Sequence, residues 1–177
     1  VSVLRGLRDS KDEQGYDQAI WSQIIELGWA GMTIPEDYGG FDFGYGGLGV
    51  VLEETGKTLV SSPLISTVLV GATAIVQLGN ETQKQDLLPK IVAGELLTAL
   101  ALDEHTNHNP SKIATTATKV DGGYALNGSK TFVLDGHVAN MLIVASRTSG
   151  ETIGEQGISL FLVDANAKGL NVVRTIM

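Results

Sequence analysis

The densest group of side chains able to do chemistry is the segment from Asp103 to His108, which reads Asp-Glu-His-Thr-Asn-His. Two carboxylates and two imidazoles at such close spacing could hold a metal ion. Zinc sites, however, usually draw their ligands from separated segments that a rigid outer set of hydrogen bonds supports. The segment is polar and runs into Asn109-Pro110, which is typical of a solvated loop. We therefore expect no metal site here.

A second candidate is the glycine-rich run at residues 44–49, GYGGLG, which matches the pattern G-x-G-x-x-G. That pattern binds a dinucleotide where a strand precedes it and an acidic residue follows about 20 positions later. Here residues 39–43 look like a loop, and no Asp or Glu lies between Glu54 and Glu81. No kinase-type lysine or catalytic loop follows either. We interpret the run as a lead-in to a closely packed helix.

His137 is the remaining histidine, and it directly follows Asp135-Gly136. This position predicts a histidine in a surface turn. No Ser-His-Asp arrangement can be proposed from the sequence.

The composition is that of a globular, acidic protein. The chain has 177 residues, 43% of them hydrophobic, and a net charge of −8. This charge opposes binding to nucleic acid and to anionic membranes, because phosphates must be met by Lys and Arg. No run of 18 apolar residues occurs, so no membrane span is predicted.

The absence of cysteine excludes disulfides and thiolate metal sites and is compatible with a reducing compartment, so we expect a cytoplasmic protein. The first residues lack the long apolar core of a signal peptide. Because the sequence starts at Val1 and not at Met, we expect a trimmed or partial chain.

The pattern of apolar residues changes near residue 97. Before that point apolar residues recur at helical spacing in three stripes, around residues 20–27, 48–59 and 65–76. Asn80 followed by Gln83 predicts a capped helix start. After residue 97 we expect short strands at 97–102, 113–120, 124–126, 131–134, 141–145, 158–163 and 170–173. The fold class is therefore α+β, with a helical domain at 1–96 and a β domain at 97–177.

Turn residues divide the β region. Gly122-Gly123 after Asp121, then Asn127-Gly128, then Asp135-Gly136 predict a β-meander whose turns need positive φ. The segment 149–157 is polar and contains glycine, which predicts an exposed hairpin loop.

Several stretches resemble the acyl-CoA dehydrogenase family. Residues 122–136, GGYALNGSKTFVLDG, are similar to "GYxLNGxKxFIxxG", and residues 26–40, ELGWAGMTIPEDYGG, to "ELGWxGxxxPEEYGG". Glu53-Glu54 and Gly56 match "VxEExG". Residues 79–104 resemble "GTEEQKxxxLPxLAxGExxxALALTE", and the match continues over 115–147 of the family's middle domain. The resemblance covers nearly all of the chain in the family's order.

The resemblance implies an N-terminal helical domain followed by an antiparallel β-barrel or sandwich-like middle domain, with the family's C-terminal helical bundle absent from this chain. It implies an oxidoreductase of fatty acid and lipid metabolism that desaturates an acyl-CoA thioester and transfers hydride to FAD. The family's catalytic glutamate lies in the bundle region, so no catalytic residue is expected in this chain, and the fragment alone is expected to be inactive. The implied partners are an acyl-CoA thioester, electron-transfer flavoprotein or a similar acceptor, and further copies in a homodimer or homotetramer.

The resemblance also assigns site residues. Leu102 and Asp103 match the family's "A-L-T-E" strand, which reaches the pyrimidine side of the flavin. The run Phe132-Val133-Leu134 matches "W/F-I-T/S", which runs along the flavin ring. Asn109 falls where the family has a serine that touches the thioester substrate.

Two of these positions depart from the family. Asp103 replaces a threonine, and a carboxylate beside the flavin would oppose the negative charge that forms on reduction. We expect Asp103 to point away, to contribute only its backbone, or to be protonated. Leu134 replaces a hydroxyl-bearing residue. The departures leave two alternatives open: a non-dehydrogenating oxidase or monooxygenase of the same fold, and a non-catalytic subunit of a heteromeric acyl-CoA dehydrogenase.

Overall fold

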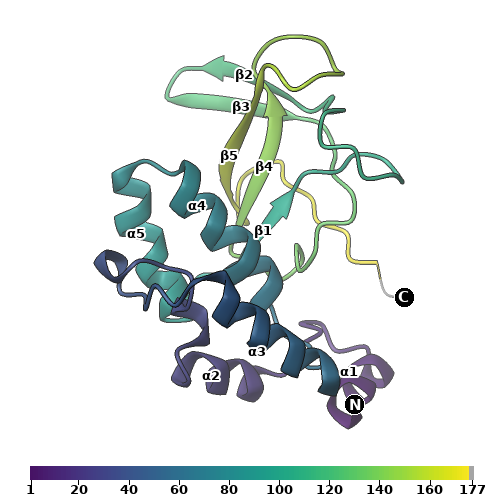
Figure 1. Ribbon diagram of the computed structural model, residues 1–177. Coiled ribbons are helices and arrows are strands. Elements are labelled where there is room, and N and C mark those ends of the chain that lie inside the picture. Colours follow the sequence, from purple (N-terminus) through teal and green to yellow (C-terminus); the bar gives the residue numbers. More distant parts are fainter. Residues whose placement is uncertain (176–177) are drawn as a thin grey trace.

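The computed structural model describes residues 1–175, with helices gathered on one side of the molecule and strands on the other (Figure 1). The α-helices are α1 (Ser2–Ser10), α2 (Gln18–Glu26), α3 (Gly44–Thr58), α4 (Thr73–Leu78) and α5 (Glu81–Val92). Two short 3₁₀ turns, η1 (Trp29–Gly31) and η2 (Glu36–Tyr38), and the π-helical segment η3 (Leu64–Ala72) complete the helical part. No helix in the described chain is long and apolar enough to cross a membrane.

Local sequence signals explain where the helices begin and end. The Asp17 carboxylate accepts hydrogen bonds from the backbone N–H groups of Ala19 and Ile20 and so caps α2. Asn80 and Gln83 form a reciprocal capping box at α5, with both bonds at 2.9 Å, which confirms the predicted helix start.

The run 44–49 forms the first turns of α3, and no strand precedes it in the described chain. The dinucleotide-binding arrangement therefore lacks its strand, as expected.

The helical part packs directly on the sheet through η3 and strand β1 (Thr98–Ala101). Thr67 Oγ1 accepts a hydrogen bond from Thr98 N at 3.1 Å, and both side chains are fully buried. A Cβ at Gly71 would lie 1.7 Å from Thr98 Oγ1, so only glycine permits this approach. The start of the sheet is thereby fixed against the helices.

The other strands are β2 (Thr116–Val120), β3 (Gly123–Asn127), β4 (Met141–Arg147) and β5 (Ile158–Asp164). The strand order is β1-β4-β2-β3, with β5 also pairing with β4. Strand β4 runs parallel to β1 and meets β2 in parallel at one residue pair, whereas the pairs β2–β3 and β4–β5 are antiparallel.

The prediction of an antiparallel barrel or sandwich-like domain is therefore wrong in its details, because the sheet is mixed and stays open within residues 1–175. The long connection between β1 and β4 lets the chain return in the same direction, and alternation of apolar residues does not encode strand direction. The coarser prediction of an α+β chain with a helical N-terminal part is confirmed.

Two expected strands do not form. Residues 131–134 lead into a turn, with φ of 53° at Phe132 and 56° at Asp135, and residues 170–173 are irregular. The tight turn at Asp121-Gly122 is confirmed, with Gly122 at φ 79° between β2 and β3.

Candidate functional site

Two segments that are distant in sequence lie side by side beyond the end of β1. The backbone N–H of Thr131 donates to the carbonyl of Asp103 at 2.8 Å, and the ammonium group of Lys130 donates to the carbonyl of Leu102 at 3.0 Å. Of the residues predicted for the site, Leu102 and Asp103 are thus brought next to the segment that carries Phe132, Val133 and Leu134.

A buried ion pair holds these segments together. Lys130 Nζ lies 2.7 Å from Glu104 Oε1, and the two side chains are only 8% and 6% exposed. The Glu104 carboxylate also accepts hydrogen bonds from the backbone N–H groups of Ala114 and Thr115 and from the Thr115 hydroxyl. The pair therefore links three segments of the chain.

The hydrogen bonds decide the charge state of Glu104. Burial alone raises the pKa of this carboxyl group, but the bonds from Lys130, Thr115 and Ala114 outweigh burial and lower the pKa to about 2. A general base needs a pKa near the working pH and a free lone pair. Glu104 is accordingly an ionised structural carboxylate.

Asp103 is directed toward the loop that follows it. His108 Nδ1 lies 2.9 and 3.1 Å from its two carboxylate oxygens, and the N–H of Asn109 donates to one of them at 3.2 Å. The contact with His108 holds the pKa of Asp103 below its usual value. This contradicts the protonated form that we considered from the sequence.

The carboxylates of the segment 103–108 thus bind protein donors. Within the part of the chain that the structure describes, no group of three or more His, Asp or Glu side chains is arranged to hold a metal ion.

The run from Phe132 to Leu134 is an open apolar surface. Phe132 is 77% exposed and Leu134 is 55% exposed, whereas Val133 packs against the buried cluster beneath the sheet. The backbone N–H groups of these three residues donate no hydrogen bond within residues 1–175. An exposed aromatic ring beside unpaired N–H donors suits a planar ligand that carries acceptor atoms at its edge.

Asp135 anchors this turn to the helical part. Its carboxylate accepts a hydrogen bond from the Ser66 hydroxyl at 2.7 Å, and Ser66 is buried in η3. This bond ties the turn to the helical part, although the side chains of Phe132 and Leu134 are exposed.

Asn109, the predicted substrate-binding residue, lies on the exposed loop that starts at Asp103. Its side-chain oxygen accepts a hydrogen bond from the Ser111 hydroxyl at 2.9 Å. No hydrogen bond joins Asn109 to Phe132 within residues 1–175, and the role of Asn109 stays a prediction.

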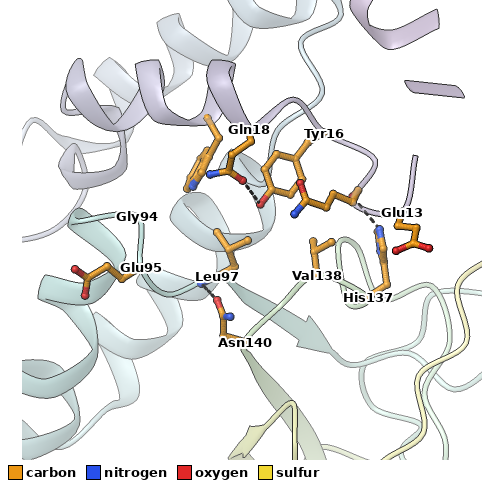
Figure 2. A pocket seen from close by; sticks show the side chains of 11 residues that line it. Glu13, Tyr16, Gln18, Gly94, Glu95, Leu97, His137, Val138 and Asn140 are labelled. Carbon is orange, nitrogen blue, oxygen red and sulfur yellow. Dashed lines mark hydrogen bonds between the residues drawn. The ribbon is translucent and has the colours of Figure 1, made fainter. Parts of the chain in front are cut away.

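A polar hollow of about 490 Å³ lies elsewhere, between residues 13–18, 94–97 and 137–140 (Figure 2). None of the predicted site residues lines it. His137 is half-buried at its rim, and its Nε2 lies 3.0 Å from the carbonyl of Gln14. His137 lies in a turn, as its position predicted, and it also bridges two distant segments. No local sequence signal indicated the hollow.

Comparisons with known proteins show the family. Residues 3–95 match the acyl-CoA dehydrogenase N-terminal domain, and residues 99–177 match the acyl-CoA dehydrogenase middle domain. The chain therefore belongs to the acyl-CoA dehydrogenase family, a family of FAD-dependent oxidoreductases.

Among curated relatives, the mitochondrial 2-methylacyl-CoA dehydrogenase of Solanum tuberosum is 34% identical over 162 residues, which are 89% of this chain and 39% of that protein. Among solved structures, a variant of the Tcur3481-Tcur3483 steroid ACAD superposes with a TM-score of 0.84 at 35% identity, over 97% of this chain and 45% of that one. The ChsE4-ChsE5 complex from Mycobacterium tuberculosis superposes with a TM-score of 0.81 at 30% identity, over 96% of this chain and 43% of the matched chain. The chain thus spans about two fifths of the length of the curated relatives it matches.

Proposed function

We propose that this chain forms the flavin-facing part of an acyl-CoA dehydrogenase that introduces a double bond between Cα and Cβ of an acyl-CoA thioester. The observation that carries the proposal is the turn at Phe132–Leu134, which Asp135 anchors to η3. This turn presents an exposed ring, and N–H groups that are unpaired within residues 1–175, beside Leu102 and Asp103. The family matches over residues 3–95 and 99–177 support the same proposal.

The described residues fit FAD as the cofactor. The N–H donors of residues 132–134 match the carbonyl and ring-nitrogen acceptors along the edge of a flavin, and the Phe132 ring offers an apolar contact. When bound, FAD supplies the oxidant that accepts hydride from the β-carbon of the thioester.

In that reaction, the residues of this chain bind and orient the cofactor and the thioester, and none of them is proposed as the catalytic base. The backbone of Leu102 and Asp103 borders the cofactor, and Phe132–Leu134 lies along it. Asn109 contacts the thioester. The further partners that we propose are electron-transfer flavoprotein or a similar acceptor, and identical subunits in a homodimer or homotetramer, in a cytoplasmic setting.

The test uses the full-length protein with bound FAD. Anaerobic addition of butyryl-CoA, 2-methylbutyryl-CoA or a steroid side-chain CoA thioester should bleach the visible absorbance of the flavin. Absence of bleaching with every thioester would contradict the proposed dehydrogenation.

Two side chains motivate the alternative functions, which are an oxidase or monooxygenase of the same fold and a non-catalytic subunit. The Asp103 carboxylate is bound by His108 and Asn109, so Asp103 offers a flavin no hydroxyl, and Leu134 offers none either. Both changes suit an oxidase or monooxygenase of the same fold, which would consume oxygen and, if an oxidase, release peroxide during turnover.

They also suit a non-catalytic subunit. One of the similar solved structures is a complex of ChsE4 with ChsE5, so a two-component assembly has a precedent among the structural neighbours. A full-length protein that purifies colourless and gains flavin only with a partner subunit would favour this alternative. Stable yellow homo-oligomers would exclude it.

A further inference from the structure

Arg147, the last residue of β4, is a buried cation without an acidic partner in the described part of the chain. It is only 6% exposed, and its guanidinium contacts four backbone carbonyls. Nε donates to Ile113 O at 3.0 Å, Nη2 donates to Ser111 O at 2.9 Å and to Gly154 O at 2.7 Å, and Nη1 donates to Gln156 O. Every nitrogen of the side chain is therefore used.

These carbonyls belong to two different loops. One is the loop that leads from Asp103 to β2, and the other is the hairpin loop between β4 and β5. The backbone joins the loops further, because Gly154 N donates to Ser111 O at 2.9 Å and Lys112 pairs with Ile153 in an isolated bridge. Arg147 lies between the loops and binds both.

A buried guanidinium without a counter-ion is costly, because desolvation of the charge is repaid only by hydrogen bonds. An apolar side chain could fill the same volume without that cost. The planar, five-donor fork of arginine reaches more carbonyls at once than the three-donor ammonium group of lysine. The arrangement therefore indicates a clamp and not simple packing.

The clamp acts on the loop that carries Asn109. Asp103 holds the N–H of Asn109 from one side, and Arg147 holds Ser111 and Ile113 from the other. The turn Asn109–Ser111 is thus fixed at both ends although Asn109 and Pro110 are exposed.

We propose that Arg147 is a positioning residue that preorganises the turn Asn109–Ser111 for contact with the acyl-CoA substrate. The inference rests on the proposed function, because that function assigns Asn109 to the thioester. A preorganised turn lowers the cost of ordering a loop on binding, so its loss appears in substrate affinity before it appears in the chemical step.

The experiment compares three variants of the full-length holoenzyme: R147M, R147K and R174M. Arg174 is the matched control, because it donates to the backbone carbonyls of Asp12 and Glu13 and so clamps a different loop. The first readout is amide hydrogen exchange over residues 109–113. The second is the separation of KM from kcat per bound flavin, with whichever of the three CoA thioesters named above the wild type turns over.

R147M should speed exchange at residues 109–113 and raise KM by about ten- to a hundredfold, with kcat per bound flavin nearly unchanged. R147K should fall between R147M and the wild type, because an ammonium group reaches fewer carbonyls. R174M should leave both readouts at wild-type values.

Unchanged exchange at 109–113 in R147M would overturn the clamp whatever the activity. Faster exchange with an unchanged KM would overturn the link to substrate. If the wild type turns over no thioester, the proposed function is wrong, and so is the assignment of the turn to substrate. Faster exchange in R147M would in that case still support the clamp between the two loops. Full rescue by R147K would overturn the role of the guanidinium fork.

Discussion

The loop 103–115 and the turn 132–134 lie next to each other but are built in opposite ways. The loop is polar, and its two carboxylates, Asp103 and Glu104, are each met by several donors. The turn is apolar, its ring and leucine face outward, and its N–H groups have no partner within the described residues. The charged groups therefore hold the loop and its neighbouring segments together, while the apolar turn stays open, as the proposed ligand contact requires.

Breaking the buried ion pair should have the largest effect. Lys130→Met leaves the Glu104 carboxylate charged and buried, so the free energy of unfolding should fall by about 3–5 kcal/mol. Urea unfolding followed by circular dichroism measures this loss.

The matched control is Lys57→Met, which breaks an ion pair with Glu54 at 2.6 Å in which both side chains are more than half exposed. That change should cost less than about 1 kcal/mol. Equal losses of unfolding free energy in the two variants would mean that the buried ion pair between Lys130 and Glu104 contributes no more to stability than an exposed one.

A methyl group at Gly128 should disturb the backbone of Thr115, which holds the buried Glu104 carboxylate. A Cβ there would lie 2.7 Å from Thr115 Cα, and Thr115 donates to Glu104 through both its N–H and its hydroxyl. Gly128→Ala should therefore destabilise the protein by about 1–3 kcal/mol, as overpacking does.

Gly122→Ala is a comparison for this variant, because nothing lies within 4 Å of a Cβ at that glycine, although its φ of 79° adds strain. Thermal unfolding of the two variants gives the difference, and a smaller loss at Gly128 than at Gly122 would contradict the tight contact with Thr115.

The pH dependence of stability should report the state of Glu104. Its folded-state pKa of about 2 lies below the usual value of 4.5, so its contribution is complete above pH 4.5 and is lost as the pH falls toward 2. Glu104→Gln should flatten the acid limb of the stability curve over that window.

Denaturant midpoints of the wild type and of Glu104→Gln, measured between pH 4.5 and pH 2, test whether stability falls with falling pH because of Glu104. An acid limb that keeps its full slope in Glu104→Gln would assign the dependence to other carboxylates.

Substitution in the turn 132–134 should change the affinity for FAD and leave the stability of the fold nearly unchanged. Phe132→Ala should change the free energy of unfolding by less than about 0.5 kcal/mol, since the ring is 77% exposed. It should weaken FAD binding by about 0.5–1.5 kcal/mol, because the aromatic contact with the cofactor is lost.

Phe43→Ala removes another exposed ring, 70% accessible and remote in sequence, and should leave FAD affinity unchanged. Fluorescence titration of the apoprotein with FAD measures both variants, and an equal loss of affinity in the two would remove Phe132 from the site.

The sequence predicts best what is decided locally. The capping box at Asn80 and Gln83 and the turn at Asp121-Gly122 depend on neighbouring residues and were correctly predicted. The family's motifs also placed the helical part before the sheet.

What the sequence did not predict depends on distant contacts. Phe132 adopts positive φ although it is not glycine, because Thr131 and Asp135 on either side are tied to Asp103 and Ser66. The parallel direction of β1 and β4 and the four carbonyls around Arg147 join segments far apart in the chain. Residue patterns within one segment carry no information about such partners.

We propose that the turn 132–134 faces a flavin. Amide hydrogen exchange of the full-length protein with and without FAD tests this orientation directly, because the N–H groups of Phe132, Val133 and Leu134 have no partner within residues 1–175. FAD should slow exchange at these three positions and leave the already bonded N–H groups of Ala114 and Thr115 unchanged. Exchange at 132–134 that stays fast while FAD is bound would show that the turn does not face the flavin.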